Sequence, residues 1–111
     1  MEWTCEEQQG SIVARPMGRV DESSVEAFSA QLDGCVSKAE EAGASQLILS
    51  LAGIEYMSSR GLRSLTLAKR RADAAAIAII LAEPNEMMQE ILAISRYDKL
   101  FRVTGSVADA V

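Results

Sequence analysis

Residues 47–62 read LILSLAGIEYMSSRGL, and this stretch decides the fold. Its opening run of leucine, isoleucine and leucine predicts a strand over residues 46–51 that is covered on both faces of a sheet. A short turn follows at Ala52-Gly53, and Ser58 and Ser59 stand where the next helix begins. Serine is favoured at a helix N-cap because its hydroxyl accepts an otherwise unpaired backbone N–H. The stretch therefore predicts a strand, a turn and a helix in direct succession.

A second helix is expected on the N-terminal side of this stretch. Ser23 or Ser24 can cap it, and Glu26 stands three residues after Ser23 as in a capping box. Apolar residues then recur at the spacing of one buried helix face. These residues are Val25, Phe28, Leu32, Cys35, Val36 and Ala39. Gly43 is placed to end the helix.

Strands and helices alternate along the rest of the chain. Strands are expected at residues 3–8, 11–17, 77–81 and 100–103, and residues 106–111 form a short helix or a tail. The helix after Ser59 carries an apolar face made by Leu62, Leu65, Ala68 and Ala72. Pro84 suits the first turn of a third helix. The order β-β-α-β-α-β-α-β predicts one α/β domain over residues 1–111, with a mixed sheet of four to five strands and flanking helices.

The amino-acid composition argues against many common classes of enzyme. The chain has no histidine, the commonest general base and metal ligand, and no Gly-x-Ser-x-Gly elbow, so a serine hydrolase is not expected. Cys5 and Cys35 have no CxxC spacing, which suggests neither a zinc site nor a disulfide framework. Neither a metal nor a cofactor is expected, and the protein is predicted not to be an enzyme.

Charge and hydropathy indicate a cytoplasmic protein. The net charge is −5, and residues 1–55 hold ten acids and three bases. Direct nucleic-acid binding is therefore not expected. The longest apolar run, residues 74–82, is too short for a membrane helix, and the acidic N-terminus lacks a signal-peptide pattern, so no membrane insertion is expected.

The two serines of residues 58–62 allow two interpretations. In the first, Ser58 and Ser59 only cap the helix. In the second, they mark a site for an anion, because a helix N-terminus presents unpaired N–H donors and the positive end of the helix dipole. The residue pattern alone leaves both open.

Three motifs in order resemble the STAS family of anti-sigma factor antagonists. They are Ser-Ser-Arg-Gly-Leu at residues 58–62, Gly-Arg-Val-Asp at 18–21 and the run from Ile91 to Phe101, and they span nearly the whole chain. The resemblance implies the STAS-like fold. It also implies a partner-switching protein that binds an anti-sigma factor when unphosphorylated and is released by phosphorylation of a serine at a helix N-terminus.

The resemblance also implies the site and the partners. The target serine lies two positions before the Gly-Leu pair, which is Ser59 here, with Ser58 as the alternative. The kinase is an anti-sigma factor with a histidine-kinase-like ATPase fold, and a PP2C-type phosphatase restores the unmodified form. The partner-binding residues expected from the family pattern are Asp21, Glu22, Met57, Ser58, Arg60 and Gly61.

The sequence departs from the family pattern at several positions. Many phosphorylated members carry an acid immediately before the target serine, where this chain has Ser58, and Ser50 replaces a frequent acid or amide. Arg60 adds a positive charge beside Ser59, and Arg96-Tyr97 stands where a Gly-Leu is common. These departures keep a second hypothesis open, a non-phosphorylated STAS scaffold or accessory subunit of a cytoplasmic or transport-associated complex.

Other residues also have two interpretations. Asp21 and Glu22 either line the kinase-facing loop or only favour the start of a helix through its dipole. The methionines at 57, 87 and 88 either form an adaptable partner surface or fill the core. The basic run of residues 69–71 is interpreted as the solvated face of a helix.

Overall fold

A mixed sheet of six strands forms the centre of the protein in the computed structural model, which describes residues 1–111. Five strands follow the order β1-β2-β3-β5-β6, and β4 pairs with β2 off this path. β1 is antiparallel to β2, and every other pair is parallel. The strands are β1 (Glu2–Gln8), β2 (Ser11–Val20), β3 (Gln46–Ser50), β4 (Ile54–Met57), β5 (Ala78–Ala82) and β6 (Arg102–Thr104). The predicted α/β class is confirmed.

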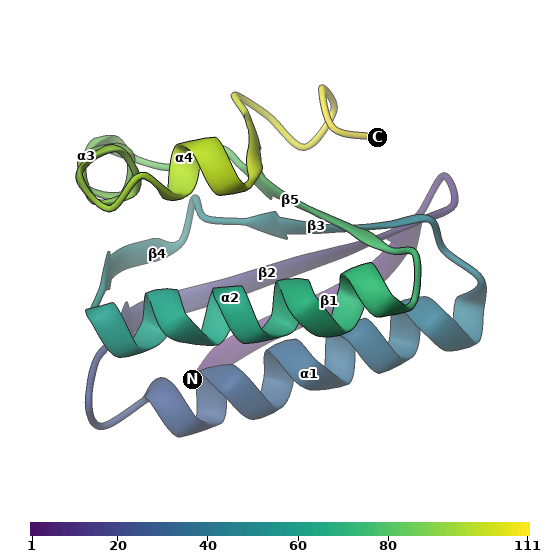
Figure 1. Cartoon of the computed structure of the whole chain (residues 1–111), viewed down its shortest axis with the longest axis horizontal. Coiled ribbons are helices and arrows are strands. Elements are labelled where there is room, and N and C mark those ends of the chain that lie inside the picture. Colours follow the sequence, from purple (N-terminus) through teal and green to yellow (C-terminus); the bar gives the residue numbers. More distant parts are fainter.

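Two long helices pack side by side on one face of the sheet (Figure 1). The helices are α1 (Val25–Ala42), α2 (Ser59–Ala74), α3 (Glu86–Ile94) and α4 (Tyr97–Leu100). α3 contacts β4, and α4 contacts α3 and β6. Val107 and Ala110 of the C-terminal segment belong to a second, smaller apolar cluster with Val13 and Ile48. No helix combines the length and apolarity needed to cross a membrane.

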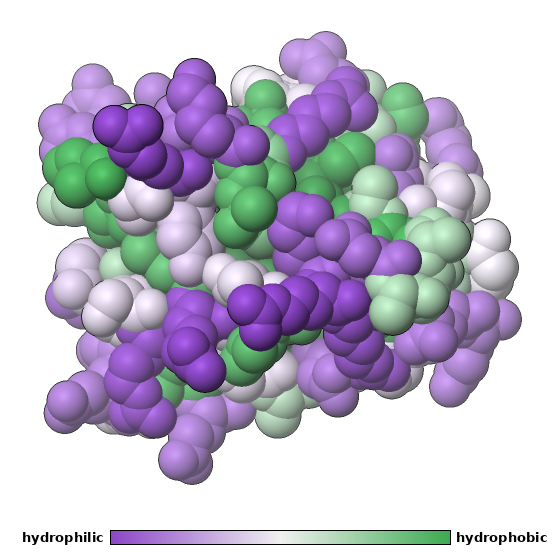
Figure 2. Space-filling view, viewed as in Figure 1, coloured by the Kyte–Doolittle hydropathy of each residue, from purple (hydrophilic) through white to green (hydrophobic).

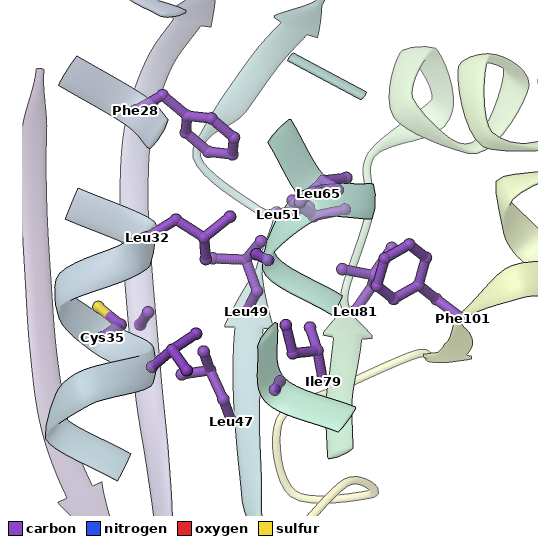
Figure 3. Close-up of a cluster of buried hydrophobic side chains, with 14 of the residues drawn as sticks. Phe28, Leu32, Cys35, Leu47, Leu49, Leu51, Leu65, Ile79, Leu81 and Phe101 are labelled. Atoms are coloured by element: carbon purple, nitrogen blue, oxygen red, sulfur yellow. The ribbon is translucent and has the colours of Figure 1, made fainter. Parts of the chain in front are cut away.

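The main core lies between the sheet and the helices α1 and α2. All six predicted positions on the inner face of α1 are buried. Leu32 of α1 points toward Leu49 of β3, and Phe28 and Leu65 belong to the same core cluster (Figure 3). Burying one such side chain stabilises the fold by about 1.5–3 kcal/mol. Because Gly43 has φ +66°, a left-handed conformation that glycine adopts at little cost, α1 ends there as predicted.

The structure has one strand and one short helix more than the pattern predicted. β4 has only four residues, too few for an alternating pattern to be recognised in the sequence. Its pairing register with β2 also shifts between Gly18 and Arg19. α4 is a single turn that ends at Leu100, which moves the start of the last strand to Arg102. Arg96 itself adopts the left-handed conformation, with φ 63°, before that turn.

Two predicted helix starts are wrong in detail. Ser24 is the N-cap of α1, but its side chain makes no cap hydrogen bond and no capping box forms. Its hydroxyl instead donates to the Arg19 carbonyl at 2.6 Å, which takes it away from the helix. Pro84 lies outside α3, because Asn85 is the N-cap and its side chain accepts from the Met88 N–H at 2.8 Å. Residues 106–111 form turns and a tail, not a helix.

Candidate functional site

Two helix N-termini lie next to each other at one edge of the sheet. β2 leads into the loop before α1, and β4 leads directly into α2. These two strands are parallel neighbours, with Val20 opposite Met57, and the Ser58 N–H donates to the Val20 carbonyl at 2.8 Å. Parallel strands end at the same edge of a sheet, so residues 21–24 and residues 58–60 are brought together across nearly forty positions of sequence.

Ser58 is the N-cap of α2. Its backbone is extended, with φ −74° and ψ 170°, and its hydroxyl accepts from the Gly61 N–H at 3.3 Å. This satisfies one of the unpaired donors that every helix N-terminus carries. The capping interpretation is therefore confirmed for Ser58, and it leaves Ser59 as the first residue inside the helix.

The Ser59 side chain is exposed and has no hydrogen-bond partner within the protein. The first intrahelical hydrogen bond runs from the Leu62 N–H to the Ser58 carbonyl at 3.0 Å, so the N–H groups of Ser59 and Arg60 have no partner along the helix. The first turn of α2 contains no acid, while Arg60 and Arg63 are both exposed. Arg63 follows Ser59 by four residues, which places both side chains on one face of the helix. The charged side chains of the first turn of α2 are therefore all positive.

Two of the expected partner-binding residues are buried. Met57 is 2% exposed, and Gly61 is also inside the protein. A Cβ at Gly61 would lie 2.6 Å from Met57 Cγ and 2.7 Å from Val20 Cγ1, distances that no real contact allows. Neither residue therefore belongs to the partner-facing surface. Their role is to let the first turn of α2 approach the ends of β2 and β4, which positions Ser58 and Ser59.

The loop before α1 is closed by its own hydrogen bonds. Asp21 Oδ1 accepts from the Ser23 hydroxyl at 2.7 Å and from the Ser23 N–H at 3.0 Å. The hydrogen bond from the Ser23 side chain, followed by that from its backbone, lowers the pKa of Asp21 below its usual value. The Ser24 hydroxyl accepts from the Asp21 N–H at 3.0 Å. Asp21 therefore does stabilise a helix start, and Glu22 beside it is exposed.

Arg19 extends the exposed surface next to this loop. Its guanidinium lies 4.7 Å from the centre of the Tyr56 ring, and its Nε lies 3.9 Å from Asp21 Oδ2. The contact joins β2 to β4 on the solvent side. Sequence reasoning missed Arg19, because its partner on β4 is brought near only by the strand pairing.

A groove of about 510 Å³ runs between the first turns of α1 and α2. Glu26 and Ser29 line it from α1, and Arg60, Arg63 and Ser64 line it from α2. The Ser29 and Ser64 hydroxyls are hydrogen-bonded to each other at its floor, which links the two helices. Hydrophilic and hydrophobic side chains are intermixed on the face seen in Figure 2. Arg63 was not among the predicted site residues, although its spacing from Ser59 was a usable signal.

The other candidate features do not form a site here. Met88 is fully buried and only Met87 is exposed, so the three methionines make no common surface. Arg71 forms ion pairs with Asp33 and Glu40 of α1, which makes this part of the basic run a contact between helices. No group of three or more acidic or sulfur-bearing side chains converges as a metal site would require.

Comparisons with known proteins agree with the fold. The chain matches the family model described as STAS domain over residues 2–110. The curated protein BtrV from Bordetella bronchiseptica, assigned by its name to the anti-sigma factor antagonists, is 27% identical over 106 residues, covering 96% of this chain and 88% of that protein.

Solved structures share the fold at lower sequence identity. The anti-sigma factor antagonist SpoIIAA in its unphosphorylated form has a TM-score of 0.76 and 19% identity, with 98% of this chain and 92% of that chain covered. The phosphorylated form of Bacillus SpoIIAA has a TM-score of 0.67 and 22% identity, with coverage of 98% and 96%. A sulfate transporter family protein from Wolinella succinogenes has a TM-score of 0.77 and 14% identity, with coverage of 93% and 83%.

Proposed function

This chain belongs to the STAS domain family, and on that premise we propose that it is an anti-sigma factor antagonist whose binding is switched off by phosphorylation of Ser59. The observation that carries the proposal is the position of Ser59. It is the exposed first residue of α2, beside the loop before α1, and its hydroxyl is free for transfer of a phosphoryl group. The unmodified protein binds an anti-sigma factor and thereby frees the sigma factor.

Ser59 is a better target than Ser58. The Ser58 hydroxyl is half-buried and already accepts from the Gly61 N–H. A kinase acting there would have to displace this cap, whose loss costs about 0.5–2 kcal/mol. The Ser59 hydroxyl requires no such disruption, so the structure favours it over the alternative.

The fold can accept a phosphate on Ser59. A phosphoserine carries about −1.5 to −2 charges and three acceptor oxygens at neutral pH. The unpaired N–H groups of Ser59 and Arg60, the helix dipole and the guanidinium of Arg63 all favour that charge. Each dipole interaction of this kind contributes about 0.3–1 kcal/mol. We therefore expect no refolding of the protein on phosphorylation.

The complex with a partner responds differently. Phosphorylation converts the neutral Ser59 hydroxyl in the interface into a bulky dianion, which must be desolvated when the partner binds. A loss of about 10³ in affinity needs only about 4 kcal/mol, which an unpaired buried charge readily supplies. Exclusion of the partner from the surface is thus the proposed mechanism.

The partners follow from the same proposal. The anti-sigma factor is a serine kinase of histidine-kinase-like ATPase fold, and a PP2C-type phosphatase removes the phosphate. The surface available to the kinase consists of Ser59 and Arg60 on α2 and of Asp21 and Glu22 before α1, so that the acids precede α1 and the base is on α2. The protein acts as a binding partner and substrate of these enzymes, and we propose no catalytic activity of its own.

A second candidate function is a scaffold without phosphorylation. Its support is the similarity to the Wolinella sulfate transporter family protein and the serine at position 58, where many phosphorylated members have an acid. A scaffold would use the same helix-end surface, but Ser59 would never be modified.

The deciding experiment is incubation with the candidate kinase and ATP, followed by intact-mass and peptide mass spectrometry. We expect one phosphate on the wild type and on Ser58→Ala, and none on Ser59→Ala. Binding of the kinase to Ser59→Ala should persist in ATP, whereas the wild type should be released. Kinase binding without any phosphate transfer would support the scaffold and contradict the switch.

A further inference from the structure

The two cysteines of the chain lie in contact, although thirty positions separate them in sequence. Cys5 is on the edge strand β1 and Cys35 is on the inner face of α1, and the two Sγ atoms are 3.3 Å apart. Both are free thiols, and the Cys35 S–H donates to Cys5 Sγ. The Cys35 sulfur lies on the side of α1 that is nearer β1, at the margin of the labelled core residues (Figure 3). Packing of α1 over the hairpin has therefore created a dithiol that sequence spacing did not indicate.

We propose that Cys5 and Cys35 are a site of reversible oxidation, at which a peroxide converts the two thiols into an intramolecular disulfide. Cys5 Sγ attacks the peroxide oxygen, which leaves a sulfenic acid on Cys5 and releases water from hydrogen peroxide. Cys35 Sγ then attacks the Cys5 sulfur, the S–O bond breaks, and the hydroxyl departs as a second water with the Cys35 proton. The peroxide is reduced, and the two sulfurs each lose one electron.

The surroundings of the two thiols set the order of these steps. Cys5 is partly exposed on a strand that has only one neighbour, so a peroxide can reach it from solvent. Cys35 is 4% exposed, and burial raises its pKa to about 12, so it is a protonated thiol shielded from a peroxide in solvent. Exposed thiols oxidise before buried ones. Cys5 is thus the peroxide-reacting residue, and Cys35 is the resolving residue.

The local structure holds the pair in this arrangement. The Trp3 ring N–H donates to Cys35 Sγ at 3.2 Å, and the Lys38 ammonium donates to the Cys5 carbonyl at 3.1 Å. These contacts tie β1 to α1 on both sides of the sulfurs. A disulfide bond is about 2.05 Å long, so the sulfurs must move closer by roughly 1.3 Å. An edge strand held by a single hairpin partner can make that shift without disturbing the central sheet.

The disulfide would cross-link β1 to α1 and close the loop that contains β2. Such a bond stabilises chiefly by restricting the unfolded chain, so oxidation should raise the urea concentration needed for unfolding. The site does not involve Ser59, and the proposal does not depend on the proposed function.

The test is treatment of the folded protein with hydrogen peroxide, followed by alkylation under native conditions and then in denaturant. For the wild type we expect an intact mass lower by two hydrogens, no alkylation in denaturant, a cross-linked peptide joining Cys5 and Cys35, and recovery of both thiols with dithiothreitol. Persistence of both thiols, or a disulfide between two molecules, would overturn the proposal.

Two variants test the order of the steps. Cys35→Ala, which places no unpaired hydroxyl in the core, should accumulate a sulfenic acid on Cys5 that dimedone labels. Cys5→Ser should remain unlabelled. Rapid labelling of Cys35 in Cys5→Ser would contradict the assignment. A wild-type time course provides the same information without a variant, because dimedone added early should trap Cys5 and dimedone added late should trap nothing. Late trapping at undiminished yield would show that Cys35 does not resolve the sulfenic acid.

Discussion

The N-termini of α1 and α2 lie at the same edge of the sheet, but they differ in which backbone N–H groups are paired. Before α1, the side chains of Asp21, Ser23 and Ser24 bond to one another and to the loop backbone. The Val25 N–H donates to the Asp21 carbonyl at 2.8 Å, although no side chain caps the helix. Before α2, Ser58 satisfies one donor, and the N–H groups of Ser59 and Arg60 have no acceptor along the helix. In this sense the start of α1 is closed by its preceding loop, whereas the start of α2 is open at Ser59, whose N–H is unpaired and whose hydroxyl is exposed.

The charged residues also differ between the two helix starts. The closed start carries Asp21 and Glu22 and the acid Glu26 in its first turn, as the helix dipole favours. The open start has no acid and is followed by Arg60 and Arg63. The comparison separates two adjacent serines: Ser58 caps the helix, and the exposed Ser59 is the residue that we propose is phosphorylated.

The largest expected effect concerns partner binding at the open start. Phosphorylation of Ser59, or Ser59→Asp as its mimic, should weaken kinase binding, by about 10³-fold for the phosphate, which is about 4 kcal/mol. The free energy of unfolding should change by less than about 1 kcal/mol. Isothermal titration calorimetry and urea unfolding measure the two quantities. Ser45→Asp, an exposed serine before β3, is the control and should bind normally. A Ser59→Asp variant that unfolds, or that binds as tightly as the wild type, would refute exclusion.

The next effect concerns how closely α2 approaches the strands. Gly61→Ala forces a Cβ to within 2.6 Å of Met57 Cγ, and overpacking of this kind costs about 1–3 kcal/mol. Gly34→Ala is the matched control, because Gly34 is also helical but has open space around it. It should be neutral or stabilise by up to about 1 kcal/mol, the helix propensity difference. Equal effects of the two variants in urea unfolding would mean that Gly61 has no packing role.

The two adjacent serines should differ in stability when each is shortened. Ser58→Ala removes the cap of α2 and should cost about 1 kcal/mol, within the range of about 0.5–2. Ser59→Ala removes an exposed hydroxyl and should stay within about 0.5 kcal/mol of the wild type. Thermal or urea unfolding of both variants measures this. If Ser59→Ala lowered the free energy of unfolding as much as Ser58→Ala does, the assignment of Ser58 alone as the helix cap would be wrong.

The smallest effect tests the closed start through pH. Hydrogen bonds from Ser23 lower the pKa of Asp21 in the folded protein from its ordinary 3.8. Folding therefore favours the carboxylate, and its contribution is present above that unfolded value and is lost as pH falls through the lower folded value. Asp21→Ala should be less stable than the wild type at pH 7, and the difference should shrink in acid. A difference that grows on acidification would contradict the assigned cause.

The elements with strong periodicity were predictable, and the short ones were not. Every inner-face residue of α1, from Val25 to Ala39, was identified because a long helix repeats its pattern several times. β4 and α4 were not predicted, because four residues are too few to establish a periodic pattern. The sequence also identified the serine pair, but not which of the two would be the cap. That choice depends on where the backbone of Ser58 turns from extended to helical, which its contact with Val20 helps to set.

Local pattern determined the α/β class, the order of the main elements and the presence of serines at the start of α2, since each depends on residues a few positions apart. Only the tertiary structure decided that two helix starts adjoin, that Met57 and Gly61 lie inside, and that Cys5 meets Cys35. These contacts join residues distant in the chain. They follow from strand register and from the packing of helices on the sheet, which no short repeat in the sequence encodes.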